Sequence, residues 1–552
     1  MQTRAEVWKA IQEEPECTVL ILGGGVDGIG VFRDLALQGV DCLLIDKADF
    51  TAGASSKSSR MIHGGLRYLE NREIGLVYEA VRERNRLLEN APHYVAPLKT
   101  TIPLVSWFAG MIRSPLHFFG LPVTPRGRGG LIVKCALVTY DLLTGRKRRI
   151  PRHFVSGKRS TRSEMPQLHP DVIASATYWD AWVSQIERLC IELLQAGTAD
   201  GLSKAINYVN IEAVNGETVT LKNQATGETT DVKPQVVINA TGAWVDLANK
   251  QLGIDTKWMG GTKGSHLVVD NAELYEALGD RMIFYEHDDG RVCIVFRFMD
   301  KVIMGSTDIR IEDPDDAECD EDEVEYMVET LQGVFPDIKV TREQIVFKFC
   351  GVRPLAAAGD SVTGTISRGH RIETTEPADG RAFPVYSMIG GKLSTFRSFA
   401  EQTCDAVLER IGKERVASTE DLPIGGGEAF PEGDDAQQEW IRKAATEANI
   451  DEQRMAILLE RYGTAAKEMA TAVPNTPLTN HPDYTIGEIQ KIVAGEMVEH
   501  LDDLICRRSV LALLGAATPE LLSELGDVVG ETLGWDADRR AAEVAAAKRV
   551  MA

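Results

Sequence analysis

A glycine-rich turn near the start of the chain has the residue spacing of a loop that binds a dinucleotide. Gly23, Gly25 and Gly28 form a GxGxxG pattern directly after an apolar run that ends at Leu22. The first glycine permits a tight turn, the second lets the backbone approach a pyrophosphate, and the third lets the following helix pack on the strand. The next apolar run, DCLLID, ends in Asp46, where a carboxylate can accept hydrogen bonds from an adenosine ribose. These features predict a dinucleotide site, but the glycines do not separate FAD from NAD.

The segment 51–70, TAGASSKSSRMIHGGLRYLE, favours FAD. It is dense in glycine and in small hydroxyl side chains, at a point where a nicotinamide enzyme would normally begin its next helix. Small residues permit the close approach of a flat ring. We therefore expect FAD as the cofactor and assign four residues of this segment to its site: Ser55, Ser56, Gly64 and Gly65.

Two histidines could act as a general base. His63 stands in MIHGG and His266 in GSHLVV. Neutral imidazole can accept a proton near physiological pH. A single histidine is more often a structural residue, however, and the sequence does not choose between these two. Asp308, in GSTD, could orient such a histidine or bind substrate, although an acid at the end of a strand is as often a turn former.

Several motifs, in order along residues 17 to 410, resemble the FAD-dependent glycerol-3-phosphate dehydrogenase family. They are GGGxxGxG, the acid after the second strand, SSKSSRMIHGGLRYLE, NATGAWVD, FCGVRPL and YSMIGGKLSTFR, and the helical tail is similar to that family's C-terminal domain. The resemblance implies oxidation of sn-glycerol 3-phosphate to dihydroxyacetone phosphate, by hydride transfer to flavin N5 and electron transfer to a quinone. The chain departs from the family pattern at Asp27, where the family often has Asn or Thr, and around residues 105 to 130.

The resemblance also implies roles for individual residues. Arg67, Tyr68 and Arg368 would bind the phosphate, for which the planar fork of arginine is suited. Arg353 and Lys392 would lie near the flavin and the reacting carbon, where a positive charge stabilises the reduced ring. The alternative for each basic residue is a surface salt bridge. The other residues assigned to the cofactor are Thr241, Gly242, Gly391, Leu393 and Ser394, together with Lys392 itself.

The elements that must position these residues alternate between apolar β-branched runs and helical patterns as far as about residue 410. We expect an α/β fold in which a Rossmann-like FAD-binding domain is interleaved with a mixed α+β substrate domain, followed by a C-terminal all-α domain. Gly, Pro and acidic residues concentrate at 422–435, which predicts a linker before the helical domain at 436–552. Within 1–421 the expected FAD-binding segments are about 17–100, 165–260 and 345–411, and the expected substrate segments are about 100–165 and 260–345.

Net charge and cysteine spacing limit the kinds of partner, metal and cellular location that we expect. The 552 residues carry a net charge of −22, which disfavours nucleic acid as a partner. The nine cysteines lack metal-binding spacing, so we expect reduced thiols, no structural metal and a cytoplasmic location. Residues 146–162 hold eight Lys and Arg, and they follow an aromatic, apolar stretch that contains Trp107 and Phe108. This cluster is either a solvated face or an attachment to the anionic inner face of the cell membrane.

Several functions stay open at this point. A polyol-phosphate dehydrogenase acting on erythritol 4-phosphate, or an oxygen-using glycerol-phosphate oxidase, would need the same residues. An amine or amino-acid oxidase would need arginine for a carboxylate but no cluster for a dianion, and the number of basic motifs disfavours it. A flavin-binding regulatory protein is the alternative from a different class. Quinone is the expected acceptor because the chain has one dinucleotide fingerprint and no cysteine motif for an iron-sulfur relay, and a homodimer is the expected assembly.

Overall fold

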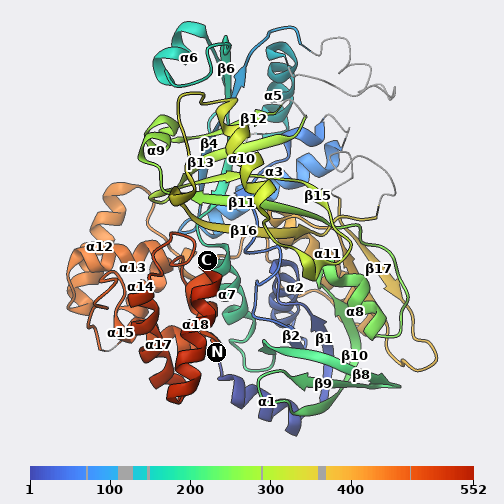
Figure 1. The fold of residues 1–552 in the computed structure, drawn as a ribbon. Helices are drawn as coiled ribbons and strands as arrows, with labels where there is room; N and C mark the ends of the chain where they lie inside the picture. The colour runs from blue at the N-terminus through green and yellow to red at the C-terminus, as the bar shows by residue number, and fades with distance from the viewer. Residues whose placement is uncertain are drawn as a thin grey trace.

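Two β-sheets and a C-terminal group of helices make up the computed structural model, which describes residues 1–69, 73–109, 129–145, 149–287, 290–357, 369–472 and 474–551 (Figure 1). The first sheet has eight strands and the second has ten. The chain passes between the two sheets several times, so segments from distant parts of the sequence meet in each. The expected fold class, a Rossmann-like domain interleaved with a mixed α+β domain and followed by helices, is confirmed.

The first sheet is Rossmann-like, and its centre is parallel. β1 lies between β10 and β2, and the parallel part is extended by β18 beyond β10 and by β7 beyond β2. Every residue of β2 and β18 is buried, as expected for central parallel strands covered on both faces. The strands are β1 Glu16–Leu22, β2 Cys42–Ile45, β7 Lys204–Ile206, β8 Val209–Asn215, β9 Thr218–Asn223, β10 Thr229–Asn239, β17 Arg371–Thr375 and β18 Val385–Ile389.

Helices cover this sheet and carry the residues that open toward the second one. α2 begins directly after the glycine turn and packs between α7 and α11. At Gly28, in the first turn of α2, only glycine fits, as described for the site below. The helices are α1 Arg4–Glu13, α2 Val26–Leu37, α7 Ile186–Gly197, α8 Val245–Gln251 and α11 Phe396–Ile411, with short helical turns at Gly242–Trp244 and Leu393–Thr395.

The second sheet is mainly antiparallel and forms the upper half of the molecule in Figure 1. Its strand order is β15-β11-β14-β13-β12-β4-β6-β3, with β16 paired to β11 and β5 paired to β6. The strands are β3 Met61–Ile62, β4 Val95–Leu104, β5 Phe154–Gly157, β6 Ala174–Val183, β11 Thr262–Val269, β12 Arg281–Glu286, β13 Val292–Phe298, β14 Lys301–Gly305, β15 Ile309–Arg310 and β16 Ile345–Arg353. Its helices are α3 Ile74–Asn90, α5 Gly130–Thr144, α6 Lys158–Glu164, α9 Ala272–Leu278 and α10 Glu321–Gln332.

Sheet membership differs from the segment boundaries expected from the sequence. β3, β4, β6 and β16 belong to the second sheet, although most of their residues fall in segments expected to bind FAD. The reason is physical: alternating apolar runs identify strands but do not say with which partner a strand pairs. Because β3 and β16 end beside the first sheet, they carry site residues across the boundary between the two domains.

The C-terminal helices pack against one side of the first domain, at the left of Figure 1. They are α12 Asp434–Ala448, α13 Glu452–Tyr462, α14 Ala466–Met469, α15 Ile486–Gly495, α16 Leu501–Asp503, a π-helical turn at Leu504–Arg508, α17 Pro519–Leu533 and α18 Ala537–Val550. The segment expected to be a linker is packed at its first half: Ile424 is buried, and its N–H donates to the Asn90 carbonyl at 2.8 Å.

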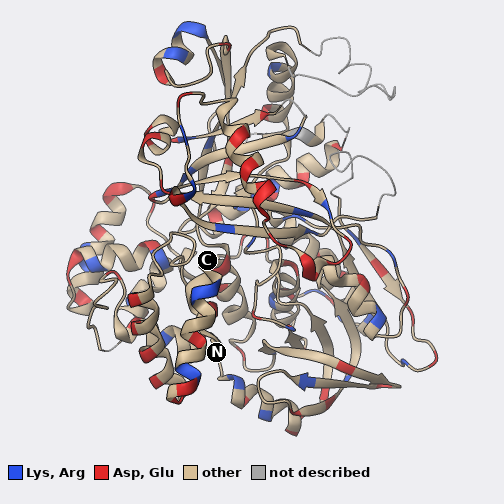
Figure 2. Cartoon of the chain, viewed as in Figure 1, with Lys and Arg blue, Asp and Glu red and all other residues tan. Residues whose placement is uncertain are grey.

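Charge is distributed unevenly over this fold. Figure 2 shows acidic residues along α10 and basic residues on α6 at the top of the molecule. Among the residues that the structure describes, no helix is both long enough and apolar enough to cross a bilayer. All nine cysteines are free thiols.

Candidate active site

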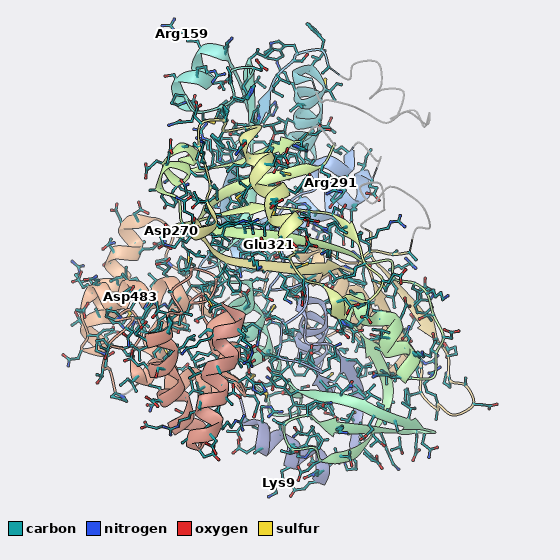
Figure 3. All side chains as sticks on the ribbon, in the orientation of Figure 1. Lys9, Arg159, Asp270, Arg291, Glu321 and Asp483 are labelled. Carbon is teal, nitrogen blue, oxygen red and sulfur yellow. The ribbon has the colours of Figure 1, made fainter. Side chains whose placement is uncertain are left out.

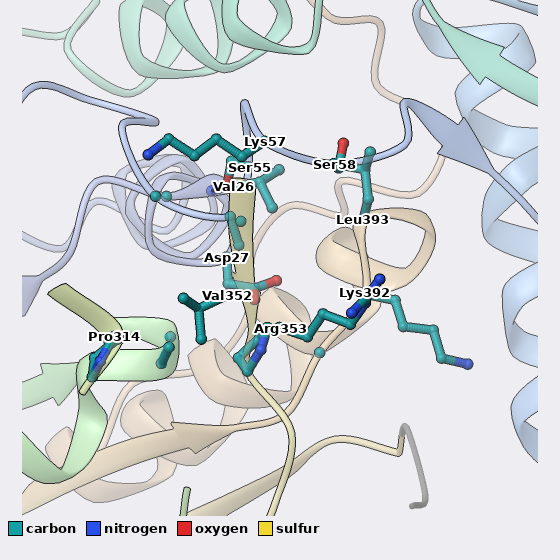
Figure 4. A pocket seen from close by; sticks show the side chains of 18 of the residues that line it. Val26, Asp27, Ser55, Lys57, Ser58, Pro314, Val352, Arg353, Lys392 and Leu393 are labelled. Atoms are coloured by element: carbon teal, nitrogen blue, oxygen red, sulfur yellow. Dashed lines mark hydrogen bonds between the residues drawn. The ribbon is translucent and has the colours of Figure 1, made fainter. Parts of the chain in front are cut away.

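A cavity of ≈ 1070 Å³ lies where the two sheets meet (Figure 4). Its wall includes the glycine turn and the end of β2 from the first sheet, and the ends of β11 and β16 from the second. The segment 51–66 and the loop before α11 complete the wall. The cavity is therefore assembled from stretches that come from distant parts of the sequence.

The glycine turn can be formed only by glycine at two of its predicted positions. Gly23 has φ +104°, and a Cβ there would lie 2.7 Å from the Ala240 carbonyl oxygen. A Cβ on Gly28 would lie 2.0 Å from the Gly23 carbonyl oxygen, so the helix could not pack on the turn. Gly25 is the N-cap of α2 and borders the cavity. The turn thus leaves backbone N–H groups and the N-terminal end of a helix facing open space, as the binding of a pyrophosphate requires.

Asp46 ends β2 at the cavity wall, as the sequence predicts. Its Oδ2 accepts a hydrogen bond from the Gly24 N–H at 2.6 Å, and its Oδ1 accepts one from the Ala48 N–H at 2.8 Å. Burial raises the pKa of Asp46 to about 6. This carboxylate therefore shapes the glycine turn in addition to facing the place where a ribose would bind.

Ser55 and Ser56 separate in the structure. The Ser55 side chain lines the cavity, and its Oγ accepts a hydrogen bond from the Val26 N–H at 2.9 Å. Ser56 is not among the residues that line the cavity, and its Oγ donates to the Gly53 carbonyl at 3.5 Å. Thr241 and Gly242 line the cavity from the turn after β10. The residues present therefore fit an extended dinucleotide such as FAD, with Ser55 as the member of the serine pair that faces it.

The HGG turn is held from behind by a buried polar network. The Gly64 N–H donates to Asp180 Oδ1 at 2.9 Å, and the same oxygen accepts from Arg84 at 2.9 Å and from the Tyr140 hydroxyl. Gly64 itself lies behind the cavity wall, whereas His63, Gly65 and Tyr68 form part of the wall. The network fixes the backbone from which these three residues reach the cavity.

Arg353, at the end of β16, is fixed by the turn that follows β14. Its Nη1 donates to Asp308 Oδ1 at 3.0 Å, and its Nη2 donates to Ser306 Oγ at 3.1 Å and to the Thr307 carbonyl at 2.9 Å. Arg353 borders the cavity, and Asp308 stands behind it. The structure thus places Asp308 against Arg353, where it helps to hold the guanidinium.

Lys392 reaches the cavity from the loop between β18 and α11. Its Nζ lies 3.8 Å from the centroid of the Tyr68 ring, and the neighbouring Gly391, Leu393 and Ser394 also line the cavity. The Ser394 hydroxyl donates to the His63 carbonyl at 3.0 Å, which joins this loop to the HGG turn. Figure 4 shows Arg353 and Lys392 on the same side of the cavity. Two basic side chains predicted from separate motifs are thereby brought into one site.

His266 is a poor general base in this position. Its Nε2 lies 2.8 Å from Ser59 Oγ, and its ring stacks on Phe349 with the centroids 5.0 Å apart. Burial, followed by the charges of Arg353 and Arg60, lowers the pKa of His266 to about 3. A group with so low a pKa stays neutral but takes up a proton reluctantly. Both histidines left open by the sequence border the cavity, and the lowered pKa makes His266 the weaker candidate for the base.

Two expected phosphate ligands fall outside the described structure. Arg368 lies in the undescribed range 358–368, and the side chain of Arg67 is likewise undescribed, although its backbone belongs to the helical turn Leu66–Leu69. Their roles stay predictions.

Sequence reasoning missed several residues of the cavity wall. Ser59 faces His266, and Lys57 borders the cavity from the same serine-rich segment, whose composition was the available signal. At the cavity rim, Asp315 accepts from Trp244 Nε1 at 2.7 Å and from Lys47 Nζ at 3.0 Å. This contact joins the two domains, and no local sequence pattern predicts it.

Comparisons with known proteins give a consistent set of likenesses. Residues 18–375 match the model of the FAD dependent oxidoreductase family, and residues 417–540 match the C-terminal domain of alpha-glycerophosphate oxidase. The chain is 30% identical to glycerol-3-phosphate dehydrogenase of Synechocystis, over 90% of this chain and 89% of that protein. It is 28% identical to D-erythritol 1-phosphate dehydrogenase of Brucella abortus, over 90% and 95%. The crystal structure of glycerol-3-phosphate dehydrogenase from Bacillus halodurans with FAD covers 100% of this chain and 98% of its own, with a TM-score of 0.77 and 20% identity.

Proposed function

The chain belongs to the FAD-dependent oxidoreductase family, and from this premise we propose that it oxidises sn-glycerol 3-phosphate to dihydroxyacetone phosphate and passes the electrons to a quinone. Family membership and FAD as the cofactor, both expected from the sequence motifs, are confirmed. The substrate is supported by the relatives named as glycerol-3-phosphate dehydrogenases, which match about nine-tenths of the chain.

The observation that carries the proposal is the meeting of Arg353, Lys392 and Tyr68 on the wall of one cavity that the dinucleotide turn also borders. A phosphate monoester is a dianion near neutral pH, so its site must supply positive charge. A carboxylate substrate, which carries one negative charge, needs less positive charge in its site. Two basic side chains and a phenol beside the cofactor cavity meet the larger requirement.

FAD, when bound, supplies the acceptor for the hydride that leaves the carbinol carbon. The side chains of the protein must do the rest. Lys392 and Arg353 supply positive charge on the cavity wall, which favours a developing alkoxide and excludes other cations. Arg353 is held by Asp308 and Ser306, so its charge needs no reorganisation during the reaction. His63 takes the hydroxyl proton, since it borders the cavity and His266 is committed to Ser59.

Two related reactions remain candidates for particular reasons. The likeness to D-erythritol 1-phosphate dehydrogenase of Brucella abortus favours a longer polyol phosphate as the second candidate. The match of residues 417–540 to a domain of alpha-glycerophosphate oxidase favours oxygen as the second candidate for the acceptor.

Anaerobic mixing of the holoenzyme with separate substrates tests the proposal. Glycerol 3-phosphate should bleach the flavin absorption band fastest, ahead of erythritol 4-phosphate and erythritol 1-phosphate, and unphosphorylated glycerol should leave the band unchanged. Reoxidation by a water-soluble quinone should then be faster than reoxidation by dissolved oxygen. Faster bleaching by an erythritol phosphate would mean that this compound, and not glycerol 3-phosphate, is the substrate. Faster reoxidation by oxygen would mean that oxygen, and not a quinone, is the acceptor.

A face at the top of the second domain supports attachment to an anionic membrane at the inner face of the cell. We call this face the cap tip. It consists of the end of β4 with residues 105–109, and of α5, β5 and α6. Its apolar side chains are unusually exposed, with Phe108 at 71% and Leu142 at 75%. α6 adds Lys158, Arg159 and Arg162, and Figure 3 shows Arg159 at the outer end of the molecule. Apolar and basic groups on one face are the requirement for interfacial binding.

Liposome flotation tests this attachment and uses the described part of the cap tip, because Arg146, Lys147, Arg148, Phe118 and Phe119 lie outside the described residues. Phe108→Asp with Leu142→Asp should abolish binding to vesicles rich in phosphatidylserine. Val416→Asp, a control at a similarly exposed apolar side chain on another part of the surface, should leave it unchanged. Equal binding by both variants would contradict the attachment.

Sedimentation equilibrium of the holoenzyme tests the expected homodimer.

A further inference from the structure

Asp27 places a carboxyl group inside the turn that, in this fold, cradles a pyrophosphate. It is the second residue of α2 and lines the cavity beside Val26 (Figure 4). Its Oδ1 is sealed from solvent and has no hydrogen-bond partner in the part of the chain that the structure describes. The proposed reaction gives this acid no task.

The surrounding backbone leaves room for the Asp27 carboxyl. Gly391, in the loop before α11, has φ +110°, and a Cβ there would lie 2.8 Å from Asp27 Oδ2. Asp27 is therefore enclosed between the start of α2 and the loop that leads into α11. A side chain of this size is accommodated, and burial, with no offsetting charge from the described residues, determines its pKa.

The titratable groups around Asp27 come from several elements. Asp46 stands at the end of β2, Cys190 on α7 and Lys392 before α11, while Lys57 and Arg353 border the same cavity. Lys392 is directed to Tyr68, and Arg353 to Asp308. Burial raises the pKa of Asp27 to about 7. Asp27 and Asp46, together with Asp180 and Asp315, therefore border a cavity that must accept two phosphate charges.

We propose that Asp27 takes up one proton from solvent when FAD binds, so that the cofactor is held by a neutral carboxylic acid at this position. FAD brings two negative charges and displaces water, and both changes disfavour a carboxylate beside it. The protonated acid can also donate a hydrogen bond, which a carboxylate cannot. The proton comes from the buffer and returns to it when FAD leaves. The inference rests on FAD as the cofactor and is independent of the substrate.

The affinity for FAD then depends on pH in a defined direction. Without the cofactor, Asp27 loses its proton as the pH rises through about 7. Above this pH, each FAD that binds must bring a proton with it, so the Kd should rise by up to about tenfold per pH unit. Below it the acid is already protonated, and this source of pH dependence disappears.

Calorimetric titration of FAD into the full-length, cofactor-depleted protein counts the protons. Titrations at about pH 8 in phosphate and in Tris, whose heats of ionisation differ, should give an uptake of about one proton per FAD. Asp27→Asn, a neutral side chain of the same shape, should bind FAD with no uptake and with a Kd that varies little with pH. Asp46→Asn is the matched control: it removes another carboxyl group beside the same glycine turn and should retain the uptake.

Two results would overturn the inference. One is an uptake by Asp27→Asn equal to that of the parent protein, since the proton would then go elsewhere. The other is a parent Kd that stays constant between about pH 7 and pH 9, which needs no variant and is independent of whether one folds. Neither result depends on glycerol 3-phosphate, so the proposed reaction could fail while this inference stands.

Discussion

The ammonium nitrogen of Lys392 lies 3.8 Å from the centroid of the Tyr68 ring, although the two residues come from opposite ends of the FAD-binding body. A cation is attracted to the face of an aromatic ring, so Tyr68 holds Lys392 in place as well as facing the cavity itself. The sequence motifs imply a phosphate-binding role for Tyr68 and a role at the flavin for Lys392. The contact between them places the two residues within one small volume.

Replacing Lys392 by Met should slow the chemical step. Its charge can favour the developing alkoxide only while the reaction proceeds, so anaerobic flavin reduction at saturating substrate should fall by about a hundredfold or more. Stopped-flow absorbance measures this rate directly. Lys250→Met is the matched control, because Lys250 also borders the cavity and should leave the rate within about twofold. A parent-like rate for Lys392→Met would remove Lys392 from the chemical step.

Two substitutions of Tyr68 separate its hydroxyl from its ring. Tyr68→Phe keeps the ring under Lys392 and removes a donor to the phosphate, so KM should rise by roughly ten- to a hundredfold with kcat nearly intact. Tyr68→Leu also removes the ring and should lower kcat, because Lys392 is no longer held. Steady-state kinetics of both variants give the comparison. If the two variants behave alike, the contact between the ring and Lys392 has no catalytic consequence.

Replacing Asp46 by Ala should weaken the retention of FAD. Asp46 accepts hydrogen bonds from Gly24 and Ala48, so its loss disturbs the glycine turn together with the ribose site. A charged hydrogen bond of this kind contributes about 1.5 to 3 kcal/mol, which corresponds to roughly ten- to a hundredfold in Kd. Fluorescence titration of the depleted protein with FAD gives the Kd. Asp41→Ala is the control: Asp41 directly precedes β2, at the end away from Asp46, and this variant should bind FAD as the parent does.

The glycine turn and the general fold class could be predicted because their causes are local. Gly28 is required by a clash with the Gly23 carbonyl oxygen, and Gly23 by its φ of +104°; both causes lie within one turn and leave a readable spacing. Asp46 could be placed for the same reason, since it ends a strand beside that turn. Helical periodicity likewise located the C-terminal domain.

Other parts of the site have causes that lie far away in the chain. Arg353 depends on Asp308 and Ser306 in the turn after another strand, and His266 depends on Ser59. No pattern near His266 reveals that burial and two arginines make it a weak base. Sheet membership fails to follow from the sequence for the same reason: the pairing of β4 with β6 is a contact between distant segments. Ser55 and Ser56 are neighbours of the same type, and only the fold decides which one faces the cavity.

The C-terminal helices should stabilise the adenosine side of the FAD site through Arg508. Its Nη2 lies 2.8 Å from Asp49 Oδ1, and neither side chain is exposed. Asp49 follows Asp46 within the same turn, so the contact joins the C-terminal domain to the place where the ribose would bind. Arg508→Ala removes one partner of a buried pair and should lower the free energy of unfolding by about 3 to 5 kcal/mol. Arg539→Ala, which removes an exposed pair with Glu499, should cost about 1 kcal/mol or less.

The pH dependence of this difference distinguishes the ion pair from lost packing. Burial opposes the charge on Asp49, yet the charges of Arg508 and Arg507 outweigh it and hold the pKa of Asp49 well below its ordinary value. A lowered pKa in the folded state gives stability that is present above about pH 4 and is lost as the pH falls further. Asp503 has the opposite sign, because burial raises its pKa to about 6. The charge of Arg508 lowers this pKa, so its loss should raise it further and add to the difference near neutral pH. Urea unfolding at a series of pH values should therefore show a difference between the parent and Arg508→Ala that is largest near neutral pH and shrinks below about pH 4. A difference that stays constant down to about pH 3 would mean that Arg508 contributes through packing and not through its charge.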